Sequence, residues 1–231
     1  MKLGIFSDSH YSSQAVTCGN RYNSQSLRKI KEAYNHFQKE NCDLIVCLGD
    51  LIDHEDKKEK VIENLKAVAE IIRNVPIPSV CLMGNHDAFA LEVETFYQIL
   101  GTSQPEEMVK DGCRLLFLDA CYLKSGRHYQ PGDDDWKDTY YPFEEQLREK
   151  LRDAKEKCYV FLHQNIDPAI PESQRLWNDE TVFNCINESG VVKAVFQGHY
   201  HTGCRSEYAG VPYIAPPAMC ENEDAYFVYE L

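Results

Sequence analysis

Several features that would quickly classify a protein are missing from this chain of 231 residues. No run of roughly 18 apolar residues occurs, so no membrane span and no membrane partner are expected. The start, Met1-Lys2-Leu3, lacks the apolar stretch of a signal peptide. The ten cysteines include no Cys-x-x-Cys pair, which removes the zinc-ribbon pattern. Together these absences predict a cytoplasmic protein with reduced thiols.

Positive charge is also scarce. The chain has 24 Lys and Arg against 37 Asp and Glu, for a net charge of −13, and no stripe rich in Lys or Arg. An acidic protein repels a polyphosphate backbone, so extended nucleic acid is not an expected partner. A small phosphoester substrate is compatible with this charge, because bound metals set the local field. The oligomeric state stays open.

The chain shows no break in composition, no internal repeat and no low-complexity segment, so we expect one domain over residues 1–231. Apolar periodicity predicts its elements. The predicted strands are 2–7, 44–48, 79–83, 113–118, 158–162 and 191–196, and the predicted helices are 26–39, 55–73, 91–100, 143–154 and 181–189. Alternating segments with Pro and Gly follow at 204–208, 211–214 and 225–230.

The order of these elements indicates the fold class. The first part alternates strand and helix, which favours a parallel sheet, and the last part favours antiparallel strands. A mixed α/β fold with two sheets accommodates both. The polar stretch 126–141, with Asp133-Asp134-Asp135, predicts a long loop without the spacing of a calcium-binding EF-hand.

Aromatic residues flank that loop, and they leave two interpretations open. They are Tyr122, Tyr129, Trp136, Tyr140 and Tyr141. Segment 122–143 is either a lid or rim over a binding site or a loop held by its own aromatic side chains. Segments 165–178 and 17–23 are further candidate rims.

Short polar clusters follow most of the apolar strands. They are Asp8-Ser9-His10, Gly49-Asp50 with Asp53, Gly84-Asn85-His86-Asp87, His163, and Gly198-His199 with His201. In open α/β sheets, ligands bind beyond the carboxyl ends of strands, so we expect these clusters to converge. Carboxylates with imidazoles suit Mn²⁺, Fe or Zn²⁺ better than Ca²⁺. A pair of such metals activates water for attack on phosphorus.

These clusters resemble the calcineurin-like metallophosphoesterase superfamily. Its pattern is D-x-H, G-D-x-x-D, G-N-H-D/E, a lone His and G-H-x-H, and the blocks occur here in that order from residue 8 to residue 201. The resemblance therefore covers nearly the whole chain. It implies an α/β fold of two mixed β-sheets packed as a sandwich with flanking helices, and a metal-dependent phosphoesterase, a hydrolase acting on ester bonds.

The resemblance also implies roles for individual residues. The implied ligands of two metal ions, with Asp50 bridging, are Asp8, His10, Asp50 and His201 for the first, and Asp50, Asn85, His163 and His199 for the second. A hydroxide bridging the metals would attack phosphorus in line with the leaving oxygen. The implied catalytic residues are His86, as general acid or charge stabiliser at the leaving group, and Asp53, which would fix the His86 tautomer. Asp87 would support the ligands through hydrogen bonds.

Two segments of the sequence narrow the range of substrates expected within the superfamily. Segment 20–27 and the Leu48–Asp53 block resemble Mn²⁺-dependent ADP-ribose/CDP-alcohol diphosphatases and bacterial cyclic-nucleotide phosphodiesterases, although the former typically have Gln at His10 and Glu at Asp87. Ser/Thr protein phosphatases have Arg where His54 stands, which disfavours that branch.

We therefore predict a phosphodiesterase or pyrophosphatase that acts on a small nucleotide-like substrate. A phosphomonoesterase is one alternative, because the metals would act in the same way on either ester. A non-catalytic scaffold that retains the fold is the other. Lost ligands would mark a scaffold, and this chain has lost none of the pattern.

Overall fold

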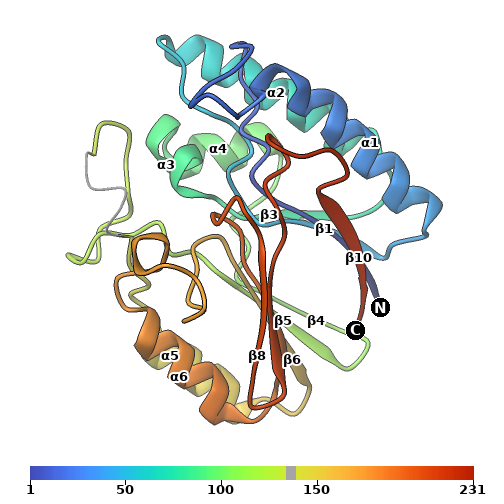
Figure 1. Cartoon of the computed structure of the whole chain (residues 1–231). Helices are drawn as coiled ribbons and strands as arrows, with labels where there is room; N and C mark the ends of the chain where they lie inside the picture. The colour runs from blue at the N-terminus through green and yellow to red at the C-terminus, as the bar shows by residue number, and fades with distance from the viewer. Residues whose placement is uncertain (134–138) are drawn as a thin grey trace.

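The computed structural model describes residues 1–133 and 139–231. Within these residues, two β-sheets pack face to face between two layers of helices (Figure 1). The first sheet has the strand order β10-β1-β2-β3, and the second has the order β4-β5-β6-β7-β9-β8. Both sheets mix parallel and antiparallel pairs, so the predicted fold class is confirmed.

The first sheet comes mainly from the N-terminal part of the chain. Its elements are β1 (Lys2–Phe6), α1 (Ser26–Lys39), β2 (Leu44–Cys47), α2 (Lys58–Arg73), β3 (Ser79–Cys81) and β10 (Tyr226–Glu230). β1, β2 and β3 run parallel, as predicted, and β10 pairs antiparallel with β1. Gly4 permits close packing here, because a Cβ atom at this position would overlap the Phe37 ring of α1.

The second sheet contains the remaining strands. Its elements are β4 (Glu107–Lys110), β5 (Cys113–Leu118), α5 (Glu144–Asp153), β6 (Lys157–Leu162), α6 (Asp179–Ser189), β7 (Val192–Phe196), β8 (Cys204–Tyr208) and β9 (Val211–Ala215). β5, β6, β7 and β9 are parallel neighbours, and β4 and β8 are antiparallel edges. The parallel pairing of β9 with β7 differs from the antiparallel arrangement expected for the tail.

Three apolar layers hold the sheets and helices together, and the middle one fixes the two sheets relative to each other. Side chains such as Leu3, Val46 and Phe161 fill the space between the sheets. A second layer lies between the first sheet and helices α1, α2 and α4 (Val93–Leu100). A third lies between the second sheet and α5 and α6. The strand ends of the two sheets are therefore held side by side.

The differences from the predicted elements are local. The predicted helix 91–100 begins at Val93, and a separate short helix, α3 (Asn85–Ala90), precedes it. The Asp87 carboxylate accepts the Gly84 N–H at 3.0 Å, which starts α3 within a cluster that the sequence indicated only as ligands. β4 was also not predicted, because its four residues are mostly exposed and lack an apolar run.

Asp134, Asp135 and Trp136 of the predicted loop lie outside the described residues, as does part of the proposed lid over 122–143. Along the described parts of the chain, no helix is both long and apolar enough to cross a bilayer.

Candidate metal centre

The predicted site residues converge where strands of both sheets end. Asp8 and Asp50 follow β1 and β2, while His163 and His199 follow β6 and β7. The His199 N–H donates to both oxygens of the Asp8 carboxylate, at 3.1 and 3.0 Å. The Gly198 N–H donates to the His163 carbonyl at 2.8 Å. The bonds from His199 join a loop of the second sheet to a loop of the first, and the bond from Gly198 joins two loops of the second sheet.

Four of the predicted ligands have an unusual backbone conformation. Asp8, His10, Asp50 and His199 have φ values of 55°, 42°, 53° and 64°. The left-handed region costs a non-glycine residue roughly 1–2 kcal/mol, and such strain concentrates at functional sites. Backbone bonds hold the strained turns, since the Asp8 N–H donates to Gly49 and the His10 N–H donates to Asp50. The fold thus fixes the directions of these side chains.

The first donor group surrounds a space suited to one metal. His10 Nε2 lies 3.1 Å from His201 Nε2, 3.4 Å from Asp50 Oδ2 and 3.8 Å from Asp8 Oδ1. His201 Nε2 lies 3.6 Å from the same Asp8 oxygen. Donor atoms about 2.0–2.2 Å from a shared metal lie roughly 3–4 Å apart, so this set fits a divalent ion.

The second donor group shares Asp50 with the first. His163 Nε2 lies 3.2 Å from Asp50 Oδ2 and 3.1 Å from Asn85 Oδ1. One ring nitrogen of His199 lies within 4.8 Å of donor atoms of Asp50 and His163. The structure therefore brings together all seven side chains predicted as ligands, with Asp50 between the two groups.

Two hydrogen bonds orient the imidazoles. His163 Nδ1 donates to the Leu48 carbonyl at 3.0 Å, which directs Nε2 toward Asp50. His201 Nδ1 donates to the Glu221 carboxylate at 2.5 Å. Partners of this kind set the tautomer and ring direction of metal-binding histidines. Glu221 was missed by the sequence analysis, because it lies outside every motif block and nothing in its local sequence marks it.

The donor side chains are buried, and their charges affect one another's pKa values. Asp8, His10, Asp50 and His163 are each no more than 1% exposed. Burial lowers the pKa of His10 to about 4 and the pKa of His199 to about 3, which leaves both imidazoles neutral donors. Burial would also lower the pKa of His163, but the Asp50 carboxylate raises it to about 9. The cluster therefore attracts positive charge, as a cation site requires.

The predicted catalytic pair is formed. His86 Nδ1 and Asp53 Oδ1 are 2.9 Å apart. The backbone N–H of His86 donates to Asp50 Oδ1 at 2.8 Å. Burial opposes protonation of His86, but Asp50 and Asp53 raise its pKa above the ordinary value. A ring nitrogen of His86 lies within 4.8 Å of donor atoms of His10 and Asp50, so the imidazole borders the first donor group.

Arg21 adds a positive charge that the sequence analysis did not place in the site. Its Nη1 lies 3.4 Å from His86 Nε2 and 3.7 Å from Asp53 Oδ2. Its backbone forms two hydrogen bonds with Thr17, and Asn23 Nδ2 donates to Asp53 at 3.1 Å. The sequence signals were its position in candidate rim 17–23 and in segment 20–27, and neither assigned it a role.

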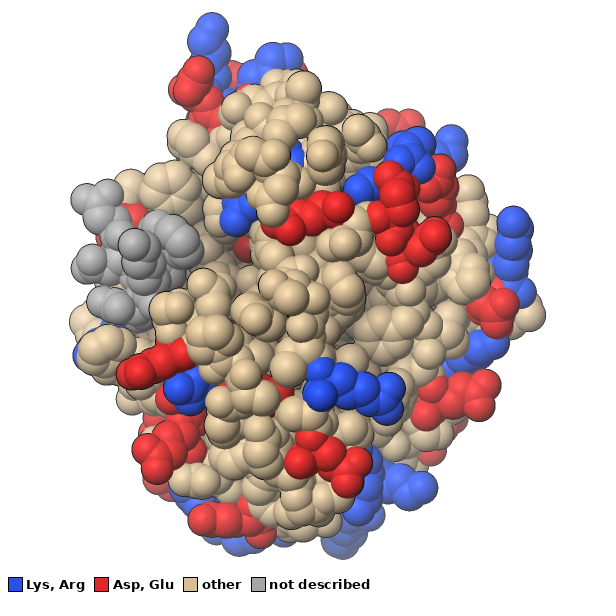
Figure 2. Space-filling view, in the orientation of Figure 1, with Lys and Arg blue, Asp and Glu red and all other residues tan. Residues whose placement is uncertain are grey.

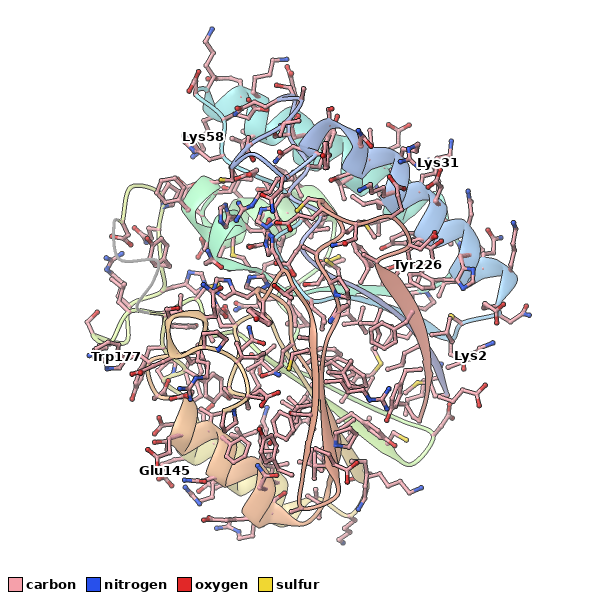
Figure 3. All side chains as sticks on the ribbon, in the orientation of Figure 1. Lys2, Lys31, Lys58, Glu145, Trp177 and Tyr226 are labelled. Atoms are coloured by element: carbon pink, nitrogen blue, oxygen red, sulfur yellow. The ribbon has the colours of Figure 1, made fainter. Side chains whose placement is uncertain are left out.

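A cavity of about 400 Å³ opens above these groups. Its lining includes Arg21, Asp50, His86, His199, His201, and Pro171, Ser173 and Gln174 of candidate rim 165–178. None of the described residues of segment 122–143 lines it. Trp177, in candidate rim 165–178, projects at the periphery of the molecule (Figure 3). Its ring contacts Lys124, whose Nζ is 3.0 Å from the ring centroid.

Asp87 supports the site from below. Its carboxylate accepts the N–H groups of Leu51 at 3.2 Å, Ile52 at 3.0 Å and Gly84 at 3.0 Å. Burial and the neighbouring Asp50 charge raise the pKa of Asp87 to about 7. Asp87 thus ties the loop that follows β2 to the loop that precedes α3, as its predicted supporting role requires.

The fold and the two donor groups define a class, the phosphoesterases with a two-metal centre. A family model for calcineurin-like phosphoesterases matches residues 1–203, and the chain belongs to this family. Its members are hydrolases that use dinuclear divalent metal centres. The predicted family and enzyme class are confirmed. A search of curated protein sequences found no match.

Solved structures share the fold at low sequence identity. A dimetal phosphatase from Danio rerio is similar with a TM-score of 0.82 and 17% identity, over 95% of this chain and 88% of that one. A phosphopantetheinyl hydrolase from Mycobacterium tuberculosis has a TM-score of 0.58 and 13% identity, over 95% and 90%. An archaeal phosphodiesterase has a TM-score of 0.51 and 14% identity, over 100% and 93%.

Proposed function

We propose that this protein is a dinuclear-metal-dependent phosphohydrolase that cleaves a phosphodiester or pyrophosphate bond in a small nucleotide-like substrate. The observation that carries the proposal is the pair of donor groups that share Asp50 at the floor of an open cavity. The cavity volume of about 400 Å³ suits a small ligand.

The donor set supports the choice of metals. Asp8, His10, Asp50 and His201 would hold the first metal, and Asp50, Asn85, His163 and His199 would hold the second. Carboxylate, imidazole and amide donors fit Mn²⁺, Fe or Zn²⁺. When bound, such a pair supplies a hydroxide nucleophile and neutralises charge on the phosphoryl oxygens.

The chain's own residues would handle the leaving group. Asp53 accepts the Nδ1 proton of His86, which leaves Nε2 as the ring nitrogen on the side of Arg21, in a residue that lines the cavity. When the imidazole is protonated, its Nε2 proton would pass to the leaving oxygen, as in general acid catalysis. Arg21 lies beside His86 and would hold a phosphoryl oxygen by charge-assisted hydrogen bonds.

The surface supports a small substrate over an extended polyanion. On the face shown in Figure 2, the Lys and Arg side chains of the described residues lie among Asp and Glu side chains and form no continuous basic stripe. The net charge of −13 acts in the same direction. We extend the proposal to a cytoplasmic location without membrane association, which the ten unpaired cysteines support.

The alternatives differ in what they require of the site. A phosphomonoesterase would use the same metals with a different leaving group, and the fold is shared with a protein described as a phosphatase. A non-catalytic scaffold is disfavoured, because every predicted ligand is present and lies in the cluster.

One experiment distinguishes the phosphodiesterase, the phosphomonoesterase and the non-catalytic scaffold. Metal content would be measured by elemental analysis, together with Mn²⁺-supplemented hydrolysis of bis-p-nitrophenyl phosphate and p-nitrophenyl phosphate. We expect about two metals per chain and faster cleavage of the diester. Preference for the monoester would support the phosphatase. Absence of metal and of turnover after reconstitution would support the scaffold.

A further inference from the structure

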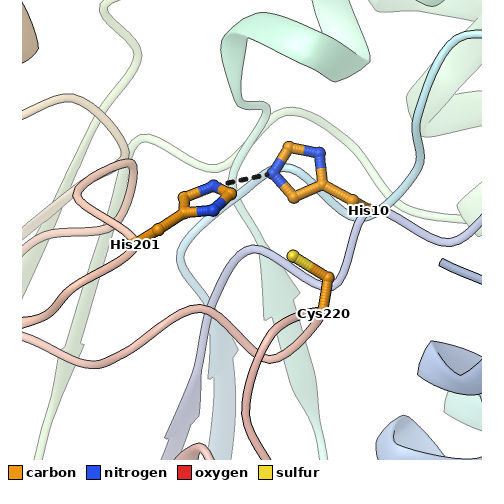
Figure 4. Close-up of side chains that lie close together, drawn as sticks. All are labelled: His10, His201 and Cys220. Carbon is orange, nitrogen blue, oxygen red and sulfur yellow. Dashed lines mark hydrogen bonds between the residues drawn. The ribbon is translucent and has the colours of Figure 1, made fainter. Parts of the chain in front are cut away.

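A cysteine faces the first donor group. Cys220 lies between β9 and β10 and is fully buried. Its sulfur and one ring nitrogen each from His10 and His201 all lie within 4.8 Å of one another. Figure 4 shows the Cys220 side chain with its sulfur directed toward the His10 and His201 rings. The three side chains come from widely separated segments of the chain.

The backbone around Cys220 is fastened to the loops that carry the ligands. The Cys220 N–H donates to the Asp8 carbonyl at 2.9 Å, and the Met219 N–H donates to the Ser7 carbonyl at 3.1 Å. The Ala218 N–H donates to the His201 carbonyl at 3.0 Å. The position of the sulfur is therefore set by the same loops that set the positions of the ligands.

The donor geometry points to a cation at this place independently of the cysteine. The Nε2 atoms of His10 and His201 are 3.1 Å apart, and an Asp8 oxygen lies 3.8 and 3.6 Å from them. Glu221, the residue after Cys220, accepts the Nδ1 proton of His201, which leaves the Nε2 lone pair for a metal. Cys220 and Glu221 thus serve the same donor group from adjacent positions.

We propose that Cys220 is an additional ligand of the first metal and makes this position prefer Zn²⁺ or Fe²⁺ over Mn²⁺. The inference rests on the two-metal site of the proposed function. On coordination a metal–sulfur bond forms, and the thiol proton leaves to solvent. A thiolate is a soft donor, and soft donors select Zn²⁺ and iron over Mn²⁺.

The first test uses cobalt as a spectroscopic probe. The wild-type protein loaded with Co²⁺ should show sulfur-to-cobalt charge-transfer absorption in the near ultraviolet, and Cys220→Ala should lose it. Cys185→Ala is the matched control, because Cys185 is a buried thiol in α6, in the apolar layer beneath the second sheet. The control should keep the band.

The second test measures metal preference. Zinc affinity would be determined by competition with a chromophoric chelator, and we expect a loss of roughly tenfold or more in Cys220→Ala. After equilibration with equal Zn²⁺ and Mn²⁺, the wild type should retain zinc, while Cys220→Ala should take up relatively more manganese.

A third measurement needs no variant, which matters if Cys220→Ala fails to fold. Zinc-edge X-ray absorption of the wild type at two metals per chain should show a sulfur neighbour at about 2.3 Å. Two bound metals without sulfur ligation, or a band that survives Cys220→Ala, would overturn the inference and leave the proposed function standing. A wild type that binds no metal would overturn both.

Discussion

At the scale of single residues, Asp50 is the carboxylate that contacts both donor groups. Its Oδ2 lies 3.4 Å from His10 Nε2 and 3.2 Å from His163 Nε2, which belong to different donor groups. Its Oδ1 accepts the His86 N–H at 2.8 Å. A single carboxylate therefore joins both metal positions to the residue proposed as the acid.

We expect Asp50→Asn to lose both metals and turnover, because the amide removes the charge shared by the two donor groups. Metal content and diester hydrolysis would be measured together. Asp111→Asn is the control, since Asp111 also has a positive φ but is exposed. An active Asp50→Asn protein with two bound metals would refute the bridging role.

His86→Ala should keep its metals and lose rate mainly on poor leaving groups. General acid catalysis contributes roughly 10²–10⁴-fold, and a p-nitrophenolate leaving group needs little of it. Rates on alkyl and p-nitrophenyl esters would be compared at equal metal content. Equal losses on both esters would contradict the acid role.

Arg21→Met should raise KM and lower kcat/KM by roughly 10–100-fold, because a hydrogen bond to a charged group contributes about 1.5–3 kcal/mol. Steady-state kinetics with the diester would measure the change. Arg28→Met is the control, since Arg28 pairs with Glu32 and Glu223 on the surface. Unchanged kinetics in Arg21→Met would remove Arg21 from substrate binding.

At the scale of elements, apolar periodicity in the sequence was sufficient to predict a helix or strand that buries one face. The predicted helix 26–39 matches α1, whose residues Ile30, Ala33 and Phe37 are buried. It was insufficient for β4, which is recognised only by its pairing with β5. The orientation of β9 likewise depends on its neighbour β7, which local sequence does not specify.

The segment after β5 contains a pH-sensitive contact. His128 Nε2 lies 2.9 Å from Asp119 Oδ2. Burial would lower the pKa of His128, but Asp119 raises it above the ordinary value. A raised folded-state pKa stabilises the fold fully below the unfolded pKa, and this stability is lost as pH rises through the folded pKa.

We therefore expect His128→Gln to lower the urea midpoint relative to wild type at about pH 6, with a smaller difference at about pH 9. Asp119→Asn should show the same trend, because it removes the other partner. A difference that grows as pH rises would contradict the assignment. Comparing each variant with wild type at the same pH cancels the effect of pH on the rest of the protein.

At the scale of the whole molecule, the site exists only because two sheets meet. Asp8 and Asp50 come from the first sheet, and His163, His199 and His201 follow strands of the second. A metal bound by both sets would link the sheets beyond their apolar contact. Such a ligand binds the folded state and not the unfolded chain.

Removal of metal by a chelator should therefore lower Tm. A ligand present at 100 times its Kd stabilises a fold by about 2.7 kcal/mol. Thermal unfolding with and without chelator would measure the effect, and restoring Mn²⁺ or Zn²⁺ should reverse it. Asp50→Asn should show little response to chelator. A wild-type Tm that does not change would argue against metals linking the sheets.

The sequence by itself determined the order of the polar blocks, the donor types and the alternation of strand and helix. These features are local, because hydrophobic periodicity and strand-end positions depend on near neighbours. The tertiary structure decided that Arg21, Cys220 and Glu221 face the same site as the motif residues. It also decided that Nε2 of His163 and His201 faces the donors. The physical reason is that side-chain direction depends on contacts with segments that are distant in sequence.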